Sequence, residues 1–179
     1  MQTRPGGAGF AQAIRVISRF GSLLREAGMT LLYHNHDFEF VNVSGQYGLD
    51  FLYDAVPSDI LQTELDVCWV KYAGINPAEY IRKYAGRCPV VHLKDYVCSV
   101  KDDATPYALI GQAEKKNEDA PAFTFRPFGY GSQNVEEVLE AGIESGAEWF
   151  IIEQDSSIGR TPLEAAEMSI GTLKRVGLK

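Results

Sequence analysis

Four short apolar runs, each ending in ionisable residues, constrain the fold of this chain more than any other feature. They read LLYHNH over 31–36, LQTELDV over 61–67, VVHLKD over 90–95 and WFIIEQD over 149–155. Side chains two residues apart on a strand point to the same face, and the carboxyl ends of parallel strands converge on one face of an α/β barrel. His, Asp and Glu side chains that arrive there from separate strands indicate a metal site.

Helical patterns separate the apolar runs. The first covers 10–27, where Ile14, Ile17, Phe20 and Leu24 recur near helical spacing and Gly28 follows as a C-cap. Further helices are expected at 49–56, at 76–86 behind an Asn-Pro start, at 135–146 after Asn134, and from Thr161 to about Val176. Strands are expected at 29–34, 60–66, 88–93 and 149–153. This alternation predicts an α/β fold with about four parallel strand–helix units.

The alternation is interrupted once, between residues 96 and 127. This stretch contains the mixed sequence KDDATPYALIGQAEKKNEDAPA and shows no helix or strand period. A connection of this length is typically a lid, an insertion or a disordered segment. We expect 1–179 to form a single domain with a long loop or lid at 96–127. The following GYGS at 129–132 lacks the context of a nucleotide-binding loop, so we interpret it as a flexible connection.

Composition and charge narrow the class of partner. A chain of 179 residues with 45% hydrophobic composition can bury a core, and its formal net charge of −7 argues against a nucleic acid or a membrane surface as partner. No apolar stretch approaches the roughly 18 residues of a membrane span, and residues 1–10 lack the apolar region of a signal peptide. Three cysteines without CxxC spacing fit a reducing compartment. We expect a cytoplasmic protein with a small-molecule ligand.

Five motifs carry a resemblance to a known family. In chain order they are YHNHDFEF, ELDVCWV, RCPVVHLKD, GYGSQN and WFIIEQD. Together they resemble the sugar phosphate isomerase/epimerase family, which has a xylose isomerase-like TIM barrel. Members generally have eight strands, and this chain resembles strands five to eight preceded by one helix. The resemblance implies a partial barrel that corresponds to the C-terminal half of the family fold.

The resemblance also implies a divalent metal, held by residues from the last four strands, commonly Glu, Asp, His and Glu. Asp66, His92 and Glu153 match the last three positions. The first position departs from the pattern, because LLYHNH places His34 where many relatives have glutamate. We therefore expect His34, Asp66, His92 and Glu153 as ligands. Carboxylates and imidazoles together suit Mn, Co, Fe or Zn better than Mg or Ca, which favour oxygen alone.

Such a metal would assist removal of a proton next to a carbonyl, because the developing enolate charge falls beside a fixed cation. Glu153 can act as the base, and Glu64 lies two residues before Asp66 on the same strand face. The alternative for Glu64 is a structural salt bridge to Lys94 or Arg87. The expected catalytic residues are Glu153, Glu64 and His36 as proton carriers, and Lys94 as a ligand for a substrate oxygen or phosphate.

Three functions are compatible with these residues. The first is a metal-dependent isomerase or epimerase that acts on a sugar or sugar phosphate. The second is a lyase or dehydratase of keto-sugars or inosose-like cyclitols, because it begins with the same proton removal and the His34 departure weakens the two-glutamate epimerase site. The third is a non-catalytic fragment or assembly partner. A half-barrel exposes two sheet edges, so we expect a homo-oligomer or a complementing half-barrel to cover them.

Overall fold

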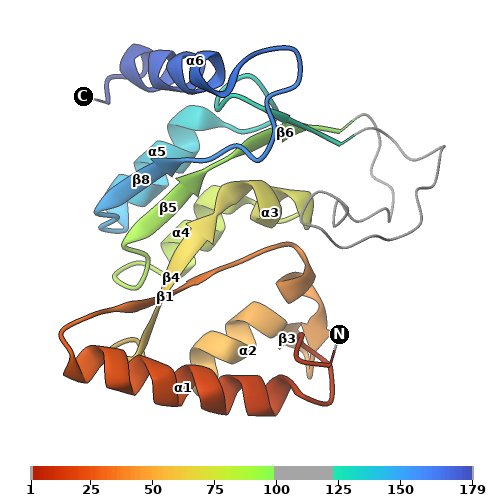
Figure 1. Ribbon diagram of the computed structural model, residues 1–179, viewed down its shortest axis with the longest axis vertical. Helices are drawn as coiled ribbons and strands as arrows, with labels where there is room; N and C mark the ends of the chain where they lie inside the picture. Colours follow the sequence, from red (N-terminus) through yellow and green to blue (C-terminus); the bar gives the residue numbers. More distant parts are fainter. Residues whose placement is uncertain (1, 99–122, 179) are drawn as a thin grey trace. The chain divides into compact units, whose positions relative to one another are not determined.

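The computed structural model describes residues 2–98 and 123–178, and the Cα atoms cluster into two compact units (Figure 1). The first unit comprises Met1–His92 and Glu137–Ile151, and the second comprises Leu93–Glu136 and Ile152–Lys179. The expectation that 1–179 forms a single domain stays a prediction.

The first unit is built on a four-stranded sheet. Its strands, in spatial order, are β1 (Leu31–His34), β4 (Leu61–Asp66), β5 (Val90–Leu93) and β8 (Trp149–Ile152). β1 pairs in parallel with β4, and β4 pairs in parallel with β5. Spatial order follows chain order, so among the described strands β1 and β8 form the edges. The four expected strands and the parallel α/β class are confirmed, each strand being one or two residues shorter than expected.

Helices precede or connect these strands at positions that local sequence explains. They are α1 (Phe10–Glu26), α2 (Gly48–Ala55), α3 (Val67–Tyr72), α4 (Pro77–Lys83) and α5 (Val135–Glu144). Gly28, with φ of +74°, follows the end of α1, and the Asn76 side chain accepts hydrogen bonds from the first amides of α4. Between β1 and α2 lie the 3-10 helix η1 (Phe38–Phe40) and the hairpin of β2 (Asn42–Val43) and β3 (Gln46–Tyr47).

The alternation of side chains along β4 separates the core of the first unit from the site. Leu61, Thr63 and Leu65 are fully buried, whereas Gln62 and Glu64 between them keep partial exposure. The buried set shares a period of two, so it lies on one face of the sheet. The other face carries the polar residues that end at Asp66. One strand therefore contributes to the apolar core with one face and to the site with the other.

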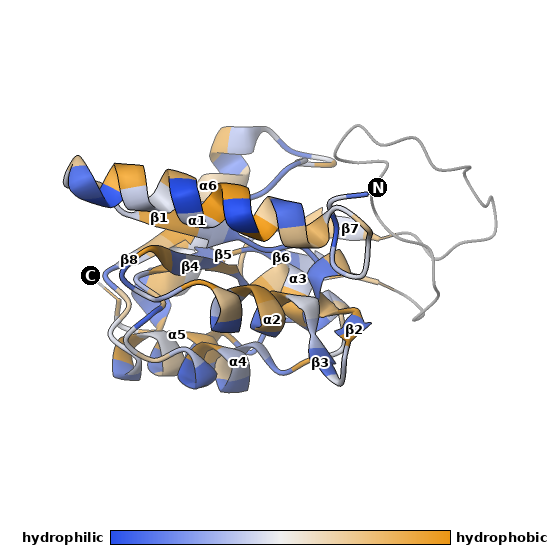
Figure 2. Cartoon of the chain, turned by 90° about the horizontal axis from the view of Figure 1, so that it is seen from below, coloured by the Kyte–Doolittle hydropathy of each residue, from blue (hydrophilic) through white to orange (hydrophobic). Residues whose placement is uncertain are grey.

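Apolar side chains also remain exposed in the first unit. Along α1, where hydrophobic and hydrophilic residues alternate (Figure 2), Val16 is 57% and Phe20 is 53% exposed. On the edge strand β8, Trp149 is 63% and Ile151 is 38% exposed. These side chains leave an apolar helix face and an apolar sheet edge open to solvent or to a partner.

The second unit contains two strands where the sequence predicted only a loop. β6 (Asp95–Val97) pairs antiparallel with β7 (Thr124–Arg126), and Tyr96 lies opposite Phe125. The prediction of a loop over 96–127 is therefore wrong at both ends. The two strands are stabilised by burial of the Tyr96 and Phe125 rings. Each strand is too short to show the alternation of side chains that would have predicted it. Most of the expected lid, residues 99–122, lies outside the described residues.

A terminal helix, α6 (Pro162–Arg175), completes the second unit. Its start has a full capping box, in which the Thr161 side chain accepts from the Glu164 amide and the Glu164 carboxylate accepts from the Thr161 amide. This confirms the helix expected from Thr161. Over residues 2–98 and 123–178, no helix combines the length and apolar character needed to cross a bilayer.

Two helical glycines differ in the space around them and give a matched test of packing. A Cβ at Gly21 of α1 would lie 2.6 Å from the Ile60 carbonyl oxygen, whereas a Cβ at Gly171 of α6 would meet nothing within 4 Å. We expect Gly21→Ala to lower the free energy of unfolding by about 1–3 kcal/mol. Gly171→Ala should raise it by about 0.5–1 kcal/mol, because alanine loses less conformational entropy in a helix. Denaturant titration measures both, and equal midpoints would contradict the packing described for α1.

Candidate metal centre

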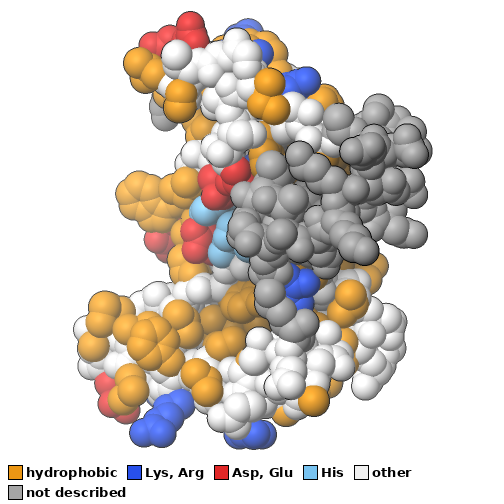
Figure 3. Space-filling model, turned by 45° about the vertical axis from the view of Figure 1, so that its right-hand side comes forward, with side chains coloured by type: hydrophobic (Ala, Val, Ile, Leu, Met, Phe, Trp, Pro, Cys, Tyr) orange, Lys and Arg blue, Asp and Glu red, His pale blue; other side chains and the backbone are white. Residues whose placement is uncertain are grey.

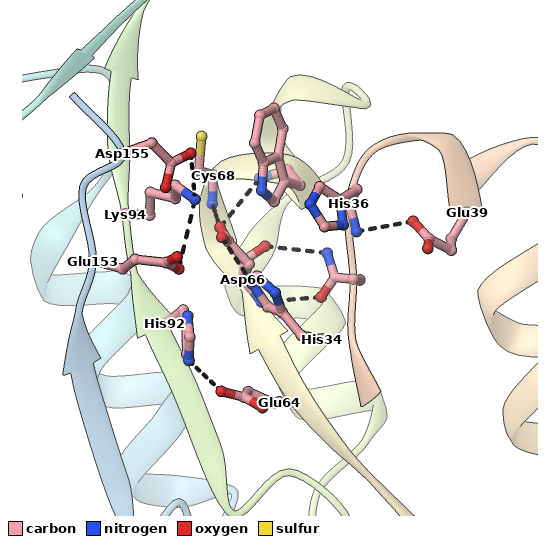
Figure 4. Close-up of polar contacts among 12 residues, drawn as sticks. His34, His36, Glu39, Glu64, Asp66, Cys68, His92, Lys94, Glu153 and Asp155 are labelled. Atoms are coloured by element: carbon pink, nitrogen blue, oxygen red, sulfur yellow. Dashed lines mark hydrogen bonds and ion pairs between the residues drawn. The ribbon is translucent and has the colours of Figure 1, made fainter. Parts of the chain in front are cut away.

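Three of the predicted ligands come together at the carboxyl ends of β1, β4 and β5 (Figure 4). His34 ends β1, Asp66 ends β4, and His92 lies opposite Asp66 in the strand register. His34 Nε2 is 3.2 Å from Asp66 Oδ2, and the His34 and His92 ring centroids are 4.6 Å apart. One ligand atom from each of the three lies within 4.8 Å of the others. The first unit can therefore present two imidazoles and one carboxylate to a single cation.

Asp66 divides its two oxygens between the fold and the site. The Asp66 Oδ1 atom accepts hydrogen bonds from the amides of Cys68 at 2.8 Å and Trp69 at 3.4 Å, which caps α3. The other oxygen, Oδ2, faces His34. The side chain is completely buried. Capping thus fixes the orientation of a carboxylate whose other oxygen lies beside the His34 imidazole.

Asn35 joins the ends of two strands, a role that was not predicted from the sequence. Its Oδ1 accepts from the Asp66 amide at 3.0 Å, and its Nδ2 donates to the Asp66 carbonyl at 3.3 Å. Asn35 is fully buried between His34 and His36 in the sequence. The position of Asn35 between two histidines, in the sequence HNH, is the local feature that could have drawn attention to it. Asn35 holds the end of β1 against the end of β4, and so holds His34 beside Asp66.

Glu64 contacts the site through a histidine. It lies opposite His34 in the register of β1 and β4, and its Oε1 is 2.5 Å from His92 Nε2. Arg87, one of the alternative salt-bridge partners, instead donates to three backbone carbonyls. Metal-binding histidines commonly donate their second ring N–H to a carboxylate. The geometry therefore places Glu64 where it can orient His92.

His36 lies beyond the end of β1, among aromatic side chains. Its ring stacks on those of Phe38 and Trp69, with centroid distances of 5.5 Å in both cases, and lies 5.3 Å from the His34 ring. The expected proton carrier is thus adjacent to one expected ligand. Its backbone amide also donates to Glu39 Oε2 at 2.8 Å.

Glu39 is a buried carboxyl group behind the site, and it was not singled out from the sequence. It is 1% exposed, and its Oε1 accepts from the Tyr33 hydroxyl at 2.8 Å. Burial raises the pKa of Glu39 to about 7, although the hydrogen bonds from Tyr33 and the His36 amide oppose that rise. The carboxyl group supports the segment that carries His34 and His36.

The second unit holds the fourth expected ligand, Glu153, together with Lys94. Glu153 follows β8 directly, and its amide donates to the Leu93 carbonyl at 3.4 Å. The Lys94 side chain is only 2% exposed, and its Nζ lies 3.0 Å from Asp155 Oδ2 and 3.5 Å from Glu153 Oε2. Two predicted site residues therefore form one charged cluster with Asp155.

The GYGS segment is fixed by a second buried carboxylate, Asp95. Its two oxygens accept five backbone N–H groups, from Tyr96, Gly129, Gly131, Ser132 and Gln133, at 2.8 to 3.1 Å. A Cβ at Gly131 would collide with Asp95 Oδ1. Burial raises the pKa of Asp95, while these hydrogen bonds lower it. The glycines serve a structural connection that depends on one carboxylate, in contrast to the flexible loop we expected.

The donor set in the first unit fits a divalent metal ion. Two imidazoles and one carboxylate form a mixed nitrogen and oxygen shell. The His34 side chain is 27% exposed, and histidine side chains reach the molecular surface (Figure 3).

Comparison with known protein sequences identifies related enzymes. A family model described as the xylose isomerase-like TIM barrel matches residues 2–176. A protein named inosose dehydratase from Clostridium botulinum is 31% identical over 157 residues, which are 84% of this chain and 49% of that protein. Another inosose dehydratase, from Clostridium perfringens, is 29% identical over the same length. The chain spans about half the length of these curated relatives.

Solved structures share the fold at lower identity. A sugar phosphate isomerase/epimerase from Parabacteroides distasonis superposes with a TM-score of 0.70 at 21% identity, covering 93% of this chain and 52% of that chain. A probable 3-DHS dehydratase, AsbF, from Bacillus anthracis gives a TM-score of 0.62 at 15% identity, covering 90% and 55%. Both likenesses concern the fold.

Replacing Asn35 tests the connection between β1 and β4. Asn35→Ala removes two buried hydrogen bonds and leaves the amide and carbonyl of Asp66 without these partners. We expect the free energy of unfolding to fall by about 2–3 kcal/mol, measured by denaturant titration. Asn42→Ala is the control, because its side chain makes one exposed turn hydrogen bond to Gly45. Equal losses from the two variants would contradict the role given to Asn35.

Glu39 should make stability depend on pH. Its pKa in the folded protein, about 7, lies above its ordinary value of 4.5, so the folded state binds the proton more tightly. The resulting stabilisation is complete below pH 4.5 and is lost as the pH rises through 7. Between these values the wild type should lose about 3 kcal/mol relative to Glu39→Gln, which mimics the protonated acid. Unfolding curves from pH 5 to 8 test this, with Glu26→Gln as an exposed control; parallel profiles would refute it.

Proposed function

We propose that this chain, which belongs to the xylose isomerase-like TIM barrel family, provides the metal-binding half of an enzyme that removes a proton next to a carbonyl group. The convergence of His34, Asp66 and His92 carries the proposal. We propose Glu153 as the fourth ligand, because it directly follows β8, the sheet neighbour of β5. The carboxyl ends of parallel strands meet at one edge of a sheet, which supports this assignment.

Among the reactions that begin with this proton removal, we favour dehydration of an inosose-like keto-cyclitol. The sequence alone placed isomerisation or epimerisation first. The relatives named inosose dehydratase, at 29–31% identity over 84% of this chain, favour the lyase alternative. The dehydration proposal also fits the histidine at the first ligand position, where the resemblance to epimerases implied glutamate.

In this proposal, each residue of the site has its own chemical role. A bound metal supplies a fixed positive charge beside the substrate carbonyl, which stabilises negative charge as the neighbouring proton leaves. Glu153 accepts that proton, and Glu64 orients His92 and is the second candidate base. His36 returns a proton to the hydroxyl group that leaves as water. Lys94 binds a substrate oxygen.

Isomerisation or epimerisation of a sugar or sugar phosphate is the second candidate. Glu64 supports it, because this carboxylate lies opposite His34, on the strand face that carries Asp66, and an epimerase needs a second group to return the proton. The third candidate, a non-catalytic assembly partner, is supported by the exposed apolar side chains of α1 and β8. These alternatives differ in turnover and in oligomeric state, so one set of measurements separates them.

Metal content provides the first test. We expect the purified chain to bind about one equivalent of Mn, Co, Fe or Zn per site, measured by elemental analysis after dialysis. His34→Gln and His92→Gln should each reduce this content strongly, because each removes one ligand. His36→Gln removes the same type of side chain from outside the ligand set and should retain the metal. An equal metal content in all four proteins, or none in the wild type, would refute the site.

Turnover provides the second test. With the metal-loaded protein and an inosose in D2O, we expect loss of water from the ring, followed by proton NMR. Deuterium incorporation without loss of water would instead support isomerisation or epimerisation, as would a shift of the carbonyl group or inversion of a ring carbon without loss of water. A protein that binds metal and causes neither reaction would support the assembly-partner reading. Sedimentation analysis in the same buffer then shows whether copies of the chain associate.

A further inference from the structure

We propose that Glu39 is a positioning residue that holds His36, the expected proton carrier, in place beside the candidate metal centre. Glu39 is 1% exposed, so it acts through its hydrogen-bond partners and does not itself reach a substrate. All residues that carry this inference belong to the first unit. It rests on the proposed function where it gives His36 a part in turnover.

The Glu39 carboxyl group joins two points of the chain on either side of the turn that follows β1. Its Oε2 accepts from the His36 backbone amide at 2.8 Å (Figure 4), and its Oε1 accepts from the Tyr33 hydroxyl at 2.8 Å. Tyr33 lies within β1, whereas Glu39 lies within η1. Bulk water cannot replace an acceptor that is buried inside the protein, so these two bonds restrain the backbone at His36.

The position of the His36 ring follows from that of the backbone. The ring stacks on Phe38 at an interplanar angle of 12° and on Trp69 at 29°, with centroid distances of 5.5 Å in both cases. Phe38 directly precedes Glu39 in η1, so the carboxyl group also restrains the chain that carries one of the two stacking partners. A displacement of the backbone at His36 or Phe38 would therefore separate these rings and move the imidazole.

His34 has a different support, although its ring lies only 5.3 Å from that of His36. It is paired with β4 through the strand register, and the neighbouring Asn35 bonds both backbone groups of Asp66. None of these bonds involves Glu39. Loss of the Glu39 carboxyl group should therefore displace the proton carrier more than the expected metal ligand.

Methionine and glutamine at position 39 provide a matched test, because both side chains have nearly the shape of glutamate. Glu39→Gln keeps an oxygen that can accept from the His36 amide. Burial raises the pKa of Glu39 to about 7, so the neutral amide is a close substitute for the acid. Glu39→Met fills the same space without an oxygen acceptor. Gly21→Ala, which is crowded by Ile60, controls for reduced stability alone.

NMR of the full chain with ¹³C-labelled histidine reports the position of the His36 ring. The chain has three histidines, and the signal that is lost in His36→Gln identifies this residue. Stacked aromatic rings displace the ring protons of His36 upfield. We expect this displacement to be lost in Glu39→Met and retained in Glu39→Gln and Gly21→Ala. Spectra at several pH values separate protonation of the ring from its position.

Metal content and turnover connect this result to the proposed function. Glu39→Met should bind as much metal as the wild type, because the supports of His34 and Asp66 remain. With an inosose as substrate, its kcat should fall roughly 100-fold at an unchanged KM, since a small displacement of a reacting group is enough for such a loss. Glu39→Gln should restore the wild-type rate.

The outcomes separate this inference from the proposed function. An unchanged His36 signal in Glu39→Met overturns the inference, as does an equal change in Glu39→Gln or Gly21→Ala. Loss of the metal in Glu39→Met also overturns it, because the carboxyl group would then support the whole site. If the wild type shows neither metal nor turnover, the proposed function fails, and the His36 signal still decides the role of Glu39.

If Glu39→Met does not fold, as judged by circular dichroism, Tyr33→Phe takes its place. This variant removes only the hydroxyl group that anchors Glu39 to β1. The His36 signal should then move in the direction expected for Glu39→Met, and an unchanged signal overturns the inference.

Discussion

The parallel register of β1, β4 and β5 is the constraint on which the candidate centre depends. It sets His34 opposite Glu64 and Asp66 opposite His92, so that four ionisable side chains share one sheet face. A shift by one residue would turn each of them toward the core, because side chains alternate along a strand. The buried Asn35 side chain, bonded to both backbone groups of Asp66, holds this register at the end where the site forms.

The placement of the ligands was predictable because it depends on two short-range rules. Period-two alternation assigns side chains to a face, and parallel strands bring their carboxyl ends to one edge. These rules were enough to predict four strands and to bring His34, Asp66 and His92 together. Helix starts at Asn76 and Thr161 were equally predictable, since capping acts within a few residues.

The supporting residues were not predictable, because their partners are distant in sequence or belong to the backbone. Asn35 bonds a residue 31 positions away, and Asp95 accepts amides that lie 34 to 38 positions further along the chain. Glu39 is acidic in a segment without a period, so nothing in the sequence indicated its burial. The strands β6 and β7 are three residues each and lie far apart in the sequence, so neither shows a local pattern.

The double use of Asp66 means that the folding of α3 also prepares the candidate metal centre. The carboxylate that caps this helix is immobilised by the Cys68 and Trp69 amides before any ion arrives. The loss of rotational freedom that an ion would otherwise impose on this side chain has already occurred during folding. Ion binding at Asp66 would therefore require little further ordering of this side chain.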